Sequence, residues 1–169
     1  GLERAGKRGA SAVLATIVAL VLFAQPDAAQ ATAFAAAAAV LLLPRTGEAR
    51  LAIRLVPLLA LAGASWLRSD PLLEVPHVEG IVGLAAELGT GWGAAALASL
   101  LLLPVPFFTA RRDADDRLPL ALGAYLSVTL LAAAVGSFPV PVLGYGASPV
   151  LGYLAAVGLL QRRRGGSAG

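Results

Sequence analysis

The sequence predicts an all-α protein, a polytopic transmembrane helical bundle of about six spans with both termini cytoplasmic. Hydrophobic residues make up 58% of the 169 residues and charged residues only 14%, whereas charged residues are about a quarter of a soluble domain. Long apolar runs alternate with short polar loops, and the basic residues collect in every second loop. These observations indicate one transmembrane domain over residues 1–169, with membrane lipids around it.

The first two spans are expected as a helical hairpin. A basic segment, residues 1–10, precedes an apolar run at 11–24, as in a signal peptide. A second apolar run, 28–43, follows at once after Gln-Pro-Asp at 25–27, and no stretch of soluble composition comes next. Because proline resists the helix interior, the turn between the two spans is predicted at 25–27.

Four more apolar runs follow, and each is taken as one span. They cover residues 55–67, 80–108, 118–136 and 149–160. Six spans place twelve of the thirteen basic residues on the side of the termini, with Arg68 alone opposite. The positive-inside rule makes the twelve-residue side cytoplasmic, so the outer loops are 25–27, 68–79 and 137–148. A net charge of +3 spread in this way serves orientation, and nucleic acid is not expected as a partner.

Two residue types are missing from the sequence, and each absence predicts something. Without cysteine there is no disulfide framework, no thiolate metal site and no cysteine nucleophile. Without methionine, even at position 1, the chain is expected to be a fragment that begins downstream of the natural start.

Small residues in the fourth span predict helix packing. Gly83, Glu87 and Gly91 are spaced i, i+4, i+8 and share one face of a continuous helix. Small faces let membrane helices approach closely, so Gly83 and Gly91 are expected to contact another helix. Glu87 on that face is expected as a buried, hydrogen-bonded structural acid or as one that faces an aqueous cavity.

The second outer loop carries the only histidine, His77, two residues before Glu79. Ionisable side chains at a membrane surface are functional candidates. An acidic residue near a helix N-terminus is also favourable by itself. Two interpretations therefore stay open: a functional pair, or a helix-capping Glu79 beside a loop histidine.

The third outer loop is expected to fold back toward the outer mouth of the bundle. Pro139 and Pro141 stiffen its first half, whereas Gly144 and Gly146 permit tight turns around Tyr145. The Tyr145 ring is expected to pack while its hydroxyl stays hydrated.

The three outer loops, in this order, resemble motifs of the SEDS family of peptidoglycan glycosyltransferases, the RodA/FtsW type. The family's Gln-Pro-Asp is matched at 25–27. Its His-Thr-Asp-Phe-Ile-Phe, leading to Glu-Glu-Leu-Gly, is matched by His-Val-Glu-Gly-Ile-Val at 77–82, leading to Glu-Leu-Gly at 87–89. Its Pro-Leu-Pro-x-x-Ser-Tyr-Gly-Gly-Ser is matched by Pro-Val-Pro-Val-Leu-Gly-Tyr-Gly-Ala-Ser at 139–148.

The resemblance covers nearly the whole chain, as the last six of the family's ten spans, and departs from the family in several places. The outer loop before the histidine is much shorter, and the family's Glu/Lys-bearing segment upstream of these spans is not in the chain. Ungapped counting back from 87–89 puts the family's aspartate at Val78, and deletion of one residue puts it at Glu79. Both alignments stay open.

The resemblance implies polymerisation of lipid II into glycan strands at the outer face of a bacterial inner membrane, for cell shape or division. Glu79 is the candidate general base for the acceptor hydroxyl, and undecaprenyl diphosphate is the leaving group. The leaving group needs positive charge or a divalent cation, and Arg68 is the only basic residue on that side. A class B penicillin-binding protein is the implied partner. The implied substrate-binding residues are Asp27, Arg68, His77, Tyr145 and Ser148.

Two other functions remain open. One is a non-catalytic SEDS relative that serves as a membrane scaffold for a transpeptidase or a lipid-linked precursor, which the shortened loop favours. The other is an unrelated small transporter, for which Glu87 is the only intramembrane ionisable support.

Overall fold

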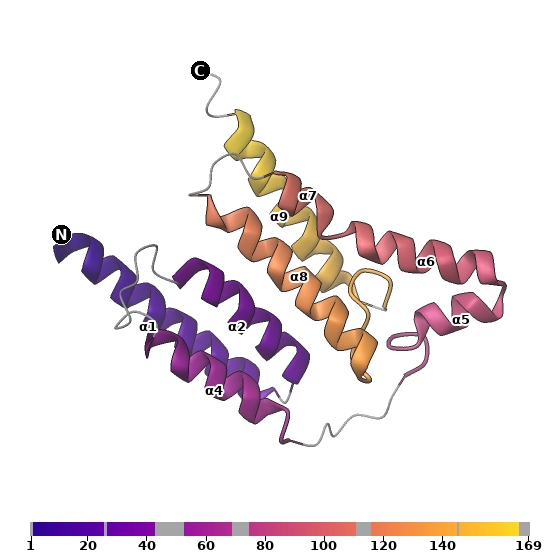
Figure 1. Ribbon diagram of the computed structural model, residues 1–169, viewed down its shortest axis with the longest axis horizontal. Coiled ribbons are helices and arrows are strands. Elements are labelled where there is room, and N and C mark those ends of the chain that lie inside the picture. Colours follow the sequence, from indigo (N-terminus) through magenta and orange to yellow (C-terminus); the bar gives the residue numbers. More distant parts are fainter. Residues whose placement is uncertain are drawn as a thin grey trace.

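The computed structural model describes residues 2–25, 27–42, 53–68, 75–110, 116–144 and 146–165. Every regular element in these ranges is a helix, in agreement with the predicted fold class. The helices, shown in Figure 1, are α1 (Leu2–Ala24), α2 (Ala28–Leu42), the short 3-10 helix η1 (Ile53–Leu55), α4 (Val56–Ser65), α5 (Ile81–Glu87), α6 (Thr90–Leu102), α7 (Val105–Thr109), α8 (Arg117–Val135) and α9 (Ala147–Gly165).

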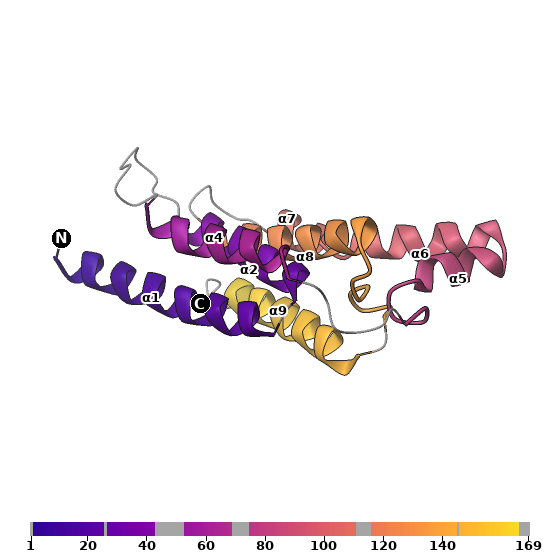
Figure 2. The same cartoon turned by 90° about the horizontal axis from the view of Figure 1, so that it is seen from below.

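The helices form two layers, with α2 at the centre of the bundle. Figure 2 shows α2, α4 and α8 in one layer and α1 and α9 in the other. Helix α2 packs against α8, α4 and α1. All six of its buried residues are alanines, so neighbouring backbones can come close to it.

Small side chains fill the interior of the bundle, and large apolar side chains point outward. Among the residues that the structure describes, eleven of the seventeen buried hydrophobic side chains are alanine. On α1, for example, Ala19 is buried while Leu14 and Ile17 are more than half exposed. A soluble protein buries its large apolar side chains, whereas membrane helices associate through small residues and turn large ones to lipid.

The long helices alternate in direction, which sorts the loops between two ends of the bundle. The N-terminus of α1 and the C-terminus of α9 lie toward the same end (Figure 1). The α1–α2 turn, the end of α4 and the α8–α9 connection lie toward the opposite end. We call this opposite end the motif end, because residues 25, 27, 75–80, 136–144 and 146–148 belong to it.

The prediction of one continuous span over residues 80–108 is wrong. The segment is a helical hairpin in which α5 runs out and α6 returns against it (Figure 1). The chain reverses at Gly89, whose φ of 146° and ψ of 147° lie outside the helical region and suit glycine alone. Hydropathy cannot detect such a break, because the residues on both sides of it are apolar.

Two helical segments of the described residues are long and apolar enough to cross a membrane by length and composition. These are Thr90–Thr109 and Arg117–Val135, with mean hydropathies of 1.7 and 2.0. Three shorter apolar helices, Ala10–Ala24, Ala28–Leu42 and Val56–Ser65, accompany them. Of the six expected spans, two therefore meet the criteria of length and composition, and the total of six stays a prediction.

Arginines satisfy helix C-termini at the two ends of the bundle. At the motif end, the guanidinium of Arg68 donates to the Phe23 carbonyl of α1 at 2.5 Å and lies 4.9 Å from the Phe23 ring centroid. At the other end, Arg117 donates to the Val40 carbonyl of α2 at 3.2 Å. Both contacts place a cation where the helix dipole and unpaired carbonyls favour it.

Candidate functional site

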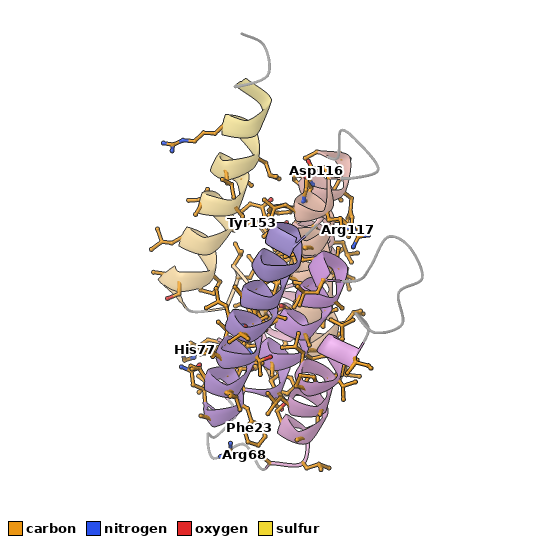
Figure 3. The ribbon with its side chains drawn as sticks, turned by 90° about the vertical axis from the view of Figure 1, so that its left-hand side faces the viewer. Phe23, Arg68, His77, Asp116, Arg117 and Tyr153 are labelled. Carbon is orange, nitrogen blue, oxygen red and sulfur yellow. The ribbon has the colours of Figure 1, made fainter. Side chains whose placement is uncertain are left out.

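The candidate residues of the first two outer loops lie toward one end of the molecule. Figure 3 shows Phe23, Arg68 and His77 toward that end, with Asp116 and Arg117 toward the other. The sequence separates the three outer motifs by about 50 residues each, and alternation of the helices brings them back together.

The first motif forms the turn into α2, and Asp27 caps that helix. The Asp27 Oδ1 atom accepts a hydrogen bond from the Gln30 backbone N–H at 2.9 Å. This is the N-cap geometry, in which a short acidic side chain satisfies an orphan donor of the first turn. Asp27, expected in substrate binding, therefore has a structural role in this structure.

The second motif forms a tight turn, and Glu79 closes it. The Val75 backbone N–H donates to Glu79 Oε2 at 2.8 Å, while the Val75 carbonyl accepts from the N–H groups of Val78 and Glu79. Glu79 is half-buried and directly precedes the N-cap residue of α5, Gly80. His77 is exposed in the same turn. The carboxylate thus stabilises its own loop, and it does not cap α5, whose N-cap residue makes no side-chain hydrogen bond to the helix.

The third motif folds back and attaches to the second. The Val140 backbone N–H donates to the Val78 carbonyl at 3.1 Å, and the Gly144 N–H donates to the Val140 carbonyl at 2.8 Å. A Cβ at Gly144 would lie 2.6 Å from both of those carbonyl oxygens, so this approach requires glycine. Fold-back of the loop agrees with the sequence-based prediction. Tyr145 lies outside the described residues.

Aromatic contacts support the same loop from the side. The Phe138 ring packs edge-on against Trp66, with centroids 5.3 Å apart. The Trp66 Nε1–H donates in turn to Thr32 Oγ1 of α2 at 2.9 Å. The end of α4, the start of α2 and the α8–α9 connection are therefore joined around the motif end.

A cavity of about 460 Å³ lies between the two layers, beside this loop. Residues of the first and third motifs line it, among them Gln25, Pro139, Pro141 and Ser148. The second motif meets its wall through the Val78–Val140 hydrogen bond. The remaining walls come mainly from α8 and α9, together with Leu22 of α1, Gln30 of α2 and Phe107 of α7. The volume is within the range of small-molecule sites, about 300–1,000 Å³.

Three cavity residues were missed in the sequence. Gln30 of α2 accepts a hydrogen bond from the hydroxyl of Tyr125 in α8, and Thr129 donates to the Tyr125 carbonyl at 2.9 Å. All three line the cavity. The signal that could have found them is their polarity inside apolar runs, because polar groups in membrane helices turn toward partners or cavities.

The expected roles of the fourth span's small face are corrected by the hairpin. Gly83 and Gly91 are exposed, and a Cβ on either meets nothing within 4 Å, so neither packs on another helix of the described chain. Glu87 is exposed at the end of α5, not buried on a packed face. The glycine that packs is Gly93, whose Cβ would lie 2.8 Å from that of Ala86. Reversal at Gly89 is the reason, because it breaks the i, i+4, i+8 register.

Arg68 and a divalent cation were the expected sources of positive charge for a diphosphate. Arg68, the expected partner of a diphosphate, is occupied by the Phe23 carbonyl and does not line the cavity. Within the part of the chain that the structure describes, no group of three or more His, Asp or Glu side chains could hold a metal ion. What this end of the bundle offers chemically is a largely apolar cavity with neutral hydrogen-bonding groups, next to an acidic turn.

No known protein family, curated protein or solved structure matches this chain. Function is therefore inferred from the sequence motifs and from the geometry of the motif end.

Proposed function

We propose that this chain is a SEDS-like integral protein of a bacterial inner membrane that polymerises lipid II into glycan strands at the outer membrane face. The observation that carries the proposal is the convergence of the three outer motifs. Residues of the first and third motifs line one cavity, and a backbone hydrogen bond joins the third motif to the second. Alternation of the helices puts the three loops at one end, and the shared cavity and the backbone hydrogen bond bring them into contact there, as a joint site requires.

The membrane part of the proposal places six segments across the bilayer with both termini cytoplasmic. Support comes from large apolar side chains on the outside and alanine on the inside. Further support comes from the basic residues that the structure describes, since all of them except Arg68 lie in helices toward one end of the bundle. The short helices α2 and α4 then require flanking residues or local thinning to complete a crossing.

In the proposed reaction, Glu79 is the general base for the acceptor hydroxyl. Its position next to the wall of the cavity supports this role, since the neighbouring Val78 carbonyl binds the cavity-lining Val140. To act as a base, the carboxylate has to exchange its hydrogen bond from the Val75 N–H for one from substrate, or accept both, since a carboxylate has about four acceptor sites.

One observation favours a second function. Glu79 closes its own turn and does not line the cavity, and Arg68 is held by Phe23. A non-catalytic relative needs no free carboxylate or free cation. Such a protein would hold a lipid-linked precursor, or a transpeptidase of the class B penicillin-binding type, without polymerising lipid II.

The test is polymerisation of lipid II by the purified chain in detergent, read as glycan strands on a gel. We expect product from the wild type and none from Glu79→Gln, because glutamine removes the base but keeps an oxygen that can accept the Val75 N–H. Glu87→Gln is the matched control and should retain activity, since Glu87 is exposed at the far end of α5.

Two results contradict the catalytic assignment. Equal product from Glu79→Gln shows that another group is the base. An inactive wild type that still captures a class B penicillin-binding protein from a defined mixture supports the scaffold function instead.

A further inference from the structure

We propose that the cavity beside α9 is a binding site for an uncharged single-chain lipid, whose apolar chain lies between α8 and α9 and whose neutral head hydrogen-bonds near Gln25 and Gln30. The cavity would not hold a diphosphate, so in the proposed reaction the diphosphate of lipid II would lie outside it. The inference does not rest on lipid II polymerisation, and it concerns the cavity alone.

The walls of the cavity are unsuited to an anion. All eighteen residues that line the cavity are uncharged, and most are apolar. An unpaired anion in such surroundings costs several kcal/mol or more. Asp27, between Gln25 and Gln30 in the sequence, adds negative charge near this mouth and disfavours an anion further. Arg68 does not line the cavity.

Polar groups are distributed unequally along the cavity, with more of them at the motif end. Gln25, Gln30 and Ser148 belong to the ends of helices at the motif end. Leu122 lies about one turn deeper along α8 than Tyr125, the partner of Gln30, and Ala156 lies about two turns deeper along α9 than Ser148. A ligand that matches both regions has a hydrogen-bonding head and an apolar chain that extends along the helices.

The polar region of the cavity keeps hydrogen-bond donors and acceptors for a ligand. The Tyr125 hydroxyl donates its hydrogen to Gln30 Oε1. The Gln30 side-chain amide therefore keeps its two N–H donors, and the Tyr125 oxygen keeps acceptor capacity. A neutral hydroxyl, which both donates and accepts, fits these groups better than a head that only accepts.

Helix α9 is held by a few large side chains and leaves room on its cavity face. Its contact with α7 and α8 comes from large side chains, such as the Phe107–Tyr153 ring pair at 5.6 Å between centroids. The residues of α9 that line the cavity, Pro149, Gly152, Tyr153 and Ala156, share one helix face. Gly152 leaves room on that face, since a Cβ there meets nothing within 4 Å.

The test is equilibrium binding of tritiated geranylgeraniol to the purified full chain in detergent, with octadecanol and geranylgeranyl diphosphate as competitors. Gly152→Leu adds a side chain to the cavity face and should weaken binding at least about tenfold, or 1.4 kcal/mol. Gly158→Leu is the matched control, because Gly158 also has nothing within 4 Å of its Cβ but does not line the cavity. It should bind like the wild type.

The competitors identify the ligand class. Competition by unlabelled geranylgeraniol but not by octadecanol indicates an isoprenoid source. Equal competition by the two alcohols indicates any single apolar chain with a hydroxyl, and both results support the site. Competition by the diphosphate equal to or stronger than that by the alcohol overturns it, and so does wild-type affinity in Gly152→Leu.

A second measurement covers a variant that fails to fold. A diazirine analogue of geranylgeraniol, cross-linked to the wild-type chain and mapped by mass spectrometry, should label α8 and α9 residues that line the cavity. Labelling confined to α5 and α6 contradicts the proposal. Because none of these readouts uses lipid II, failure of the polymerase assay leaves their outcome unchanged.

Discussion

Asp27 shows how a motif residue can serve structure first. Its carboxylate caps α2, the central helix, through the Gln30 N–H. Asp27→Ala should lower the free energy of unfolding by about 1 kcal/mol, the usual cost of losing an N-cap. Thermal unfolding in detergent measures the change.

Asp27→Asn is the control for that substitution, since asparagine keeps the acceptor oxygen and is an equally good cap. It should unfold close to the wild-type temperature. If both variants lose stability equally, charge at this position matters more than the cap.

Glu79 and Arg68 show what residue types can and cannot reveal. The sequence singles out both, because ionisable side chains near apolar segments are costly without a purpose. It could not show that a backbone N–H and a helix carbonyl were available to satisfy them. Such partners depend on turn geometry and on which helix end lies nearby, and neither is encoded in residue type.

In the α5–α6 hairpin, the backbone of Gly93 packs closely against Ala86. A leucine at Gly93 would collide with the Ala86 backbone and side chain, at 2.8–3.4 Å from the added Cβ. Gly93→Leu should therefore cost about 1–3 kcal/mol, as overpacking does. Limited proteolysis around residues 87–92, compared with thermal unfolding, can assign the loss to the hairpin.

Gly91→Leu is the matched change, two residues away in the same helix. Nothing lies within 4 Å of a Cβ there, so the hairpin should tolerate it. Should Gly91→Leu be the damaging variant and Gly93→Leu the mild one, the segment is a continuous helix with the packing face first expected from its sequence.

The α8–α9 connection is the element on which the motif end depends most. Gly144→Ala would place a methyl group 2.6 Å from two backbone oxygens, which cannot move without breaking the Val78–Val140 link. We expect a loss of about 1–3 kcal/mol. We also expect weaker geranylgeraniol binding, because this loop lines the cavity.

Gly146→Ala provides the comparison, since its nearest neighbour is a Pro149 side-chain carbon at 3.4 Å. Stability and binding should both stay near wild type. A Gly144→Ala protein with unchanged stability and affinity would mean that the loop is not held against Val78 in solution.

Across the whole molecule, the parts that hydropathy and turn residues control were predictable from sequence. The helical class, the turn at 25–27 and the fold-back at 139–144 follow from apolar runs and from prolines and glycines. The hairpin did not follow, because its reversal depends on the φ of Gly89 within an apolar segment. The cavity did not follow either, because Gln30 and Tyr125 come from helices about 95 positions apart.

Orientation of the whole bundle is the last expectation, and it follows from charge. Alternating helices put the start of α1, the start of α8 and the end of α9 toward one end (Figure 1). Among the residues that the structure describes, every basic residue except Arg68 belongs to these segments or to η1, so the positive-inside rule predicts that this end is cytoplasmic. The chain has no cysteine, so a single introduced thiol reports its own side. Ser137 and Gln161 are both exposed, one in the α8–α9 connection and the other near the end of α9.

In intact spheroplasts, a membrane-impermeant maleimide should label Ser137→Cys at once and Gln161→Cys only after permeabilisation. The physical reason is that most of α9, from Ala147 to Gln161, separates the two positions. This part of the helix is about 21 Å long at about 1.5 Å per residue, so flanking residues have to complete a crossing of the roughly 30 Å apolar core. Labelling in the opposite order would reverse the orientation and place the cavity at the cytoplasmic face, out of reach of an outer-face precursor. Labelling of both thiols in intact cells would mean that α9 does not cross, and the six-segment arrangement would fail with it.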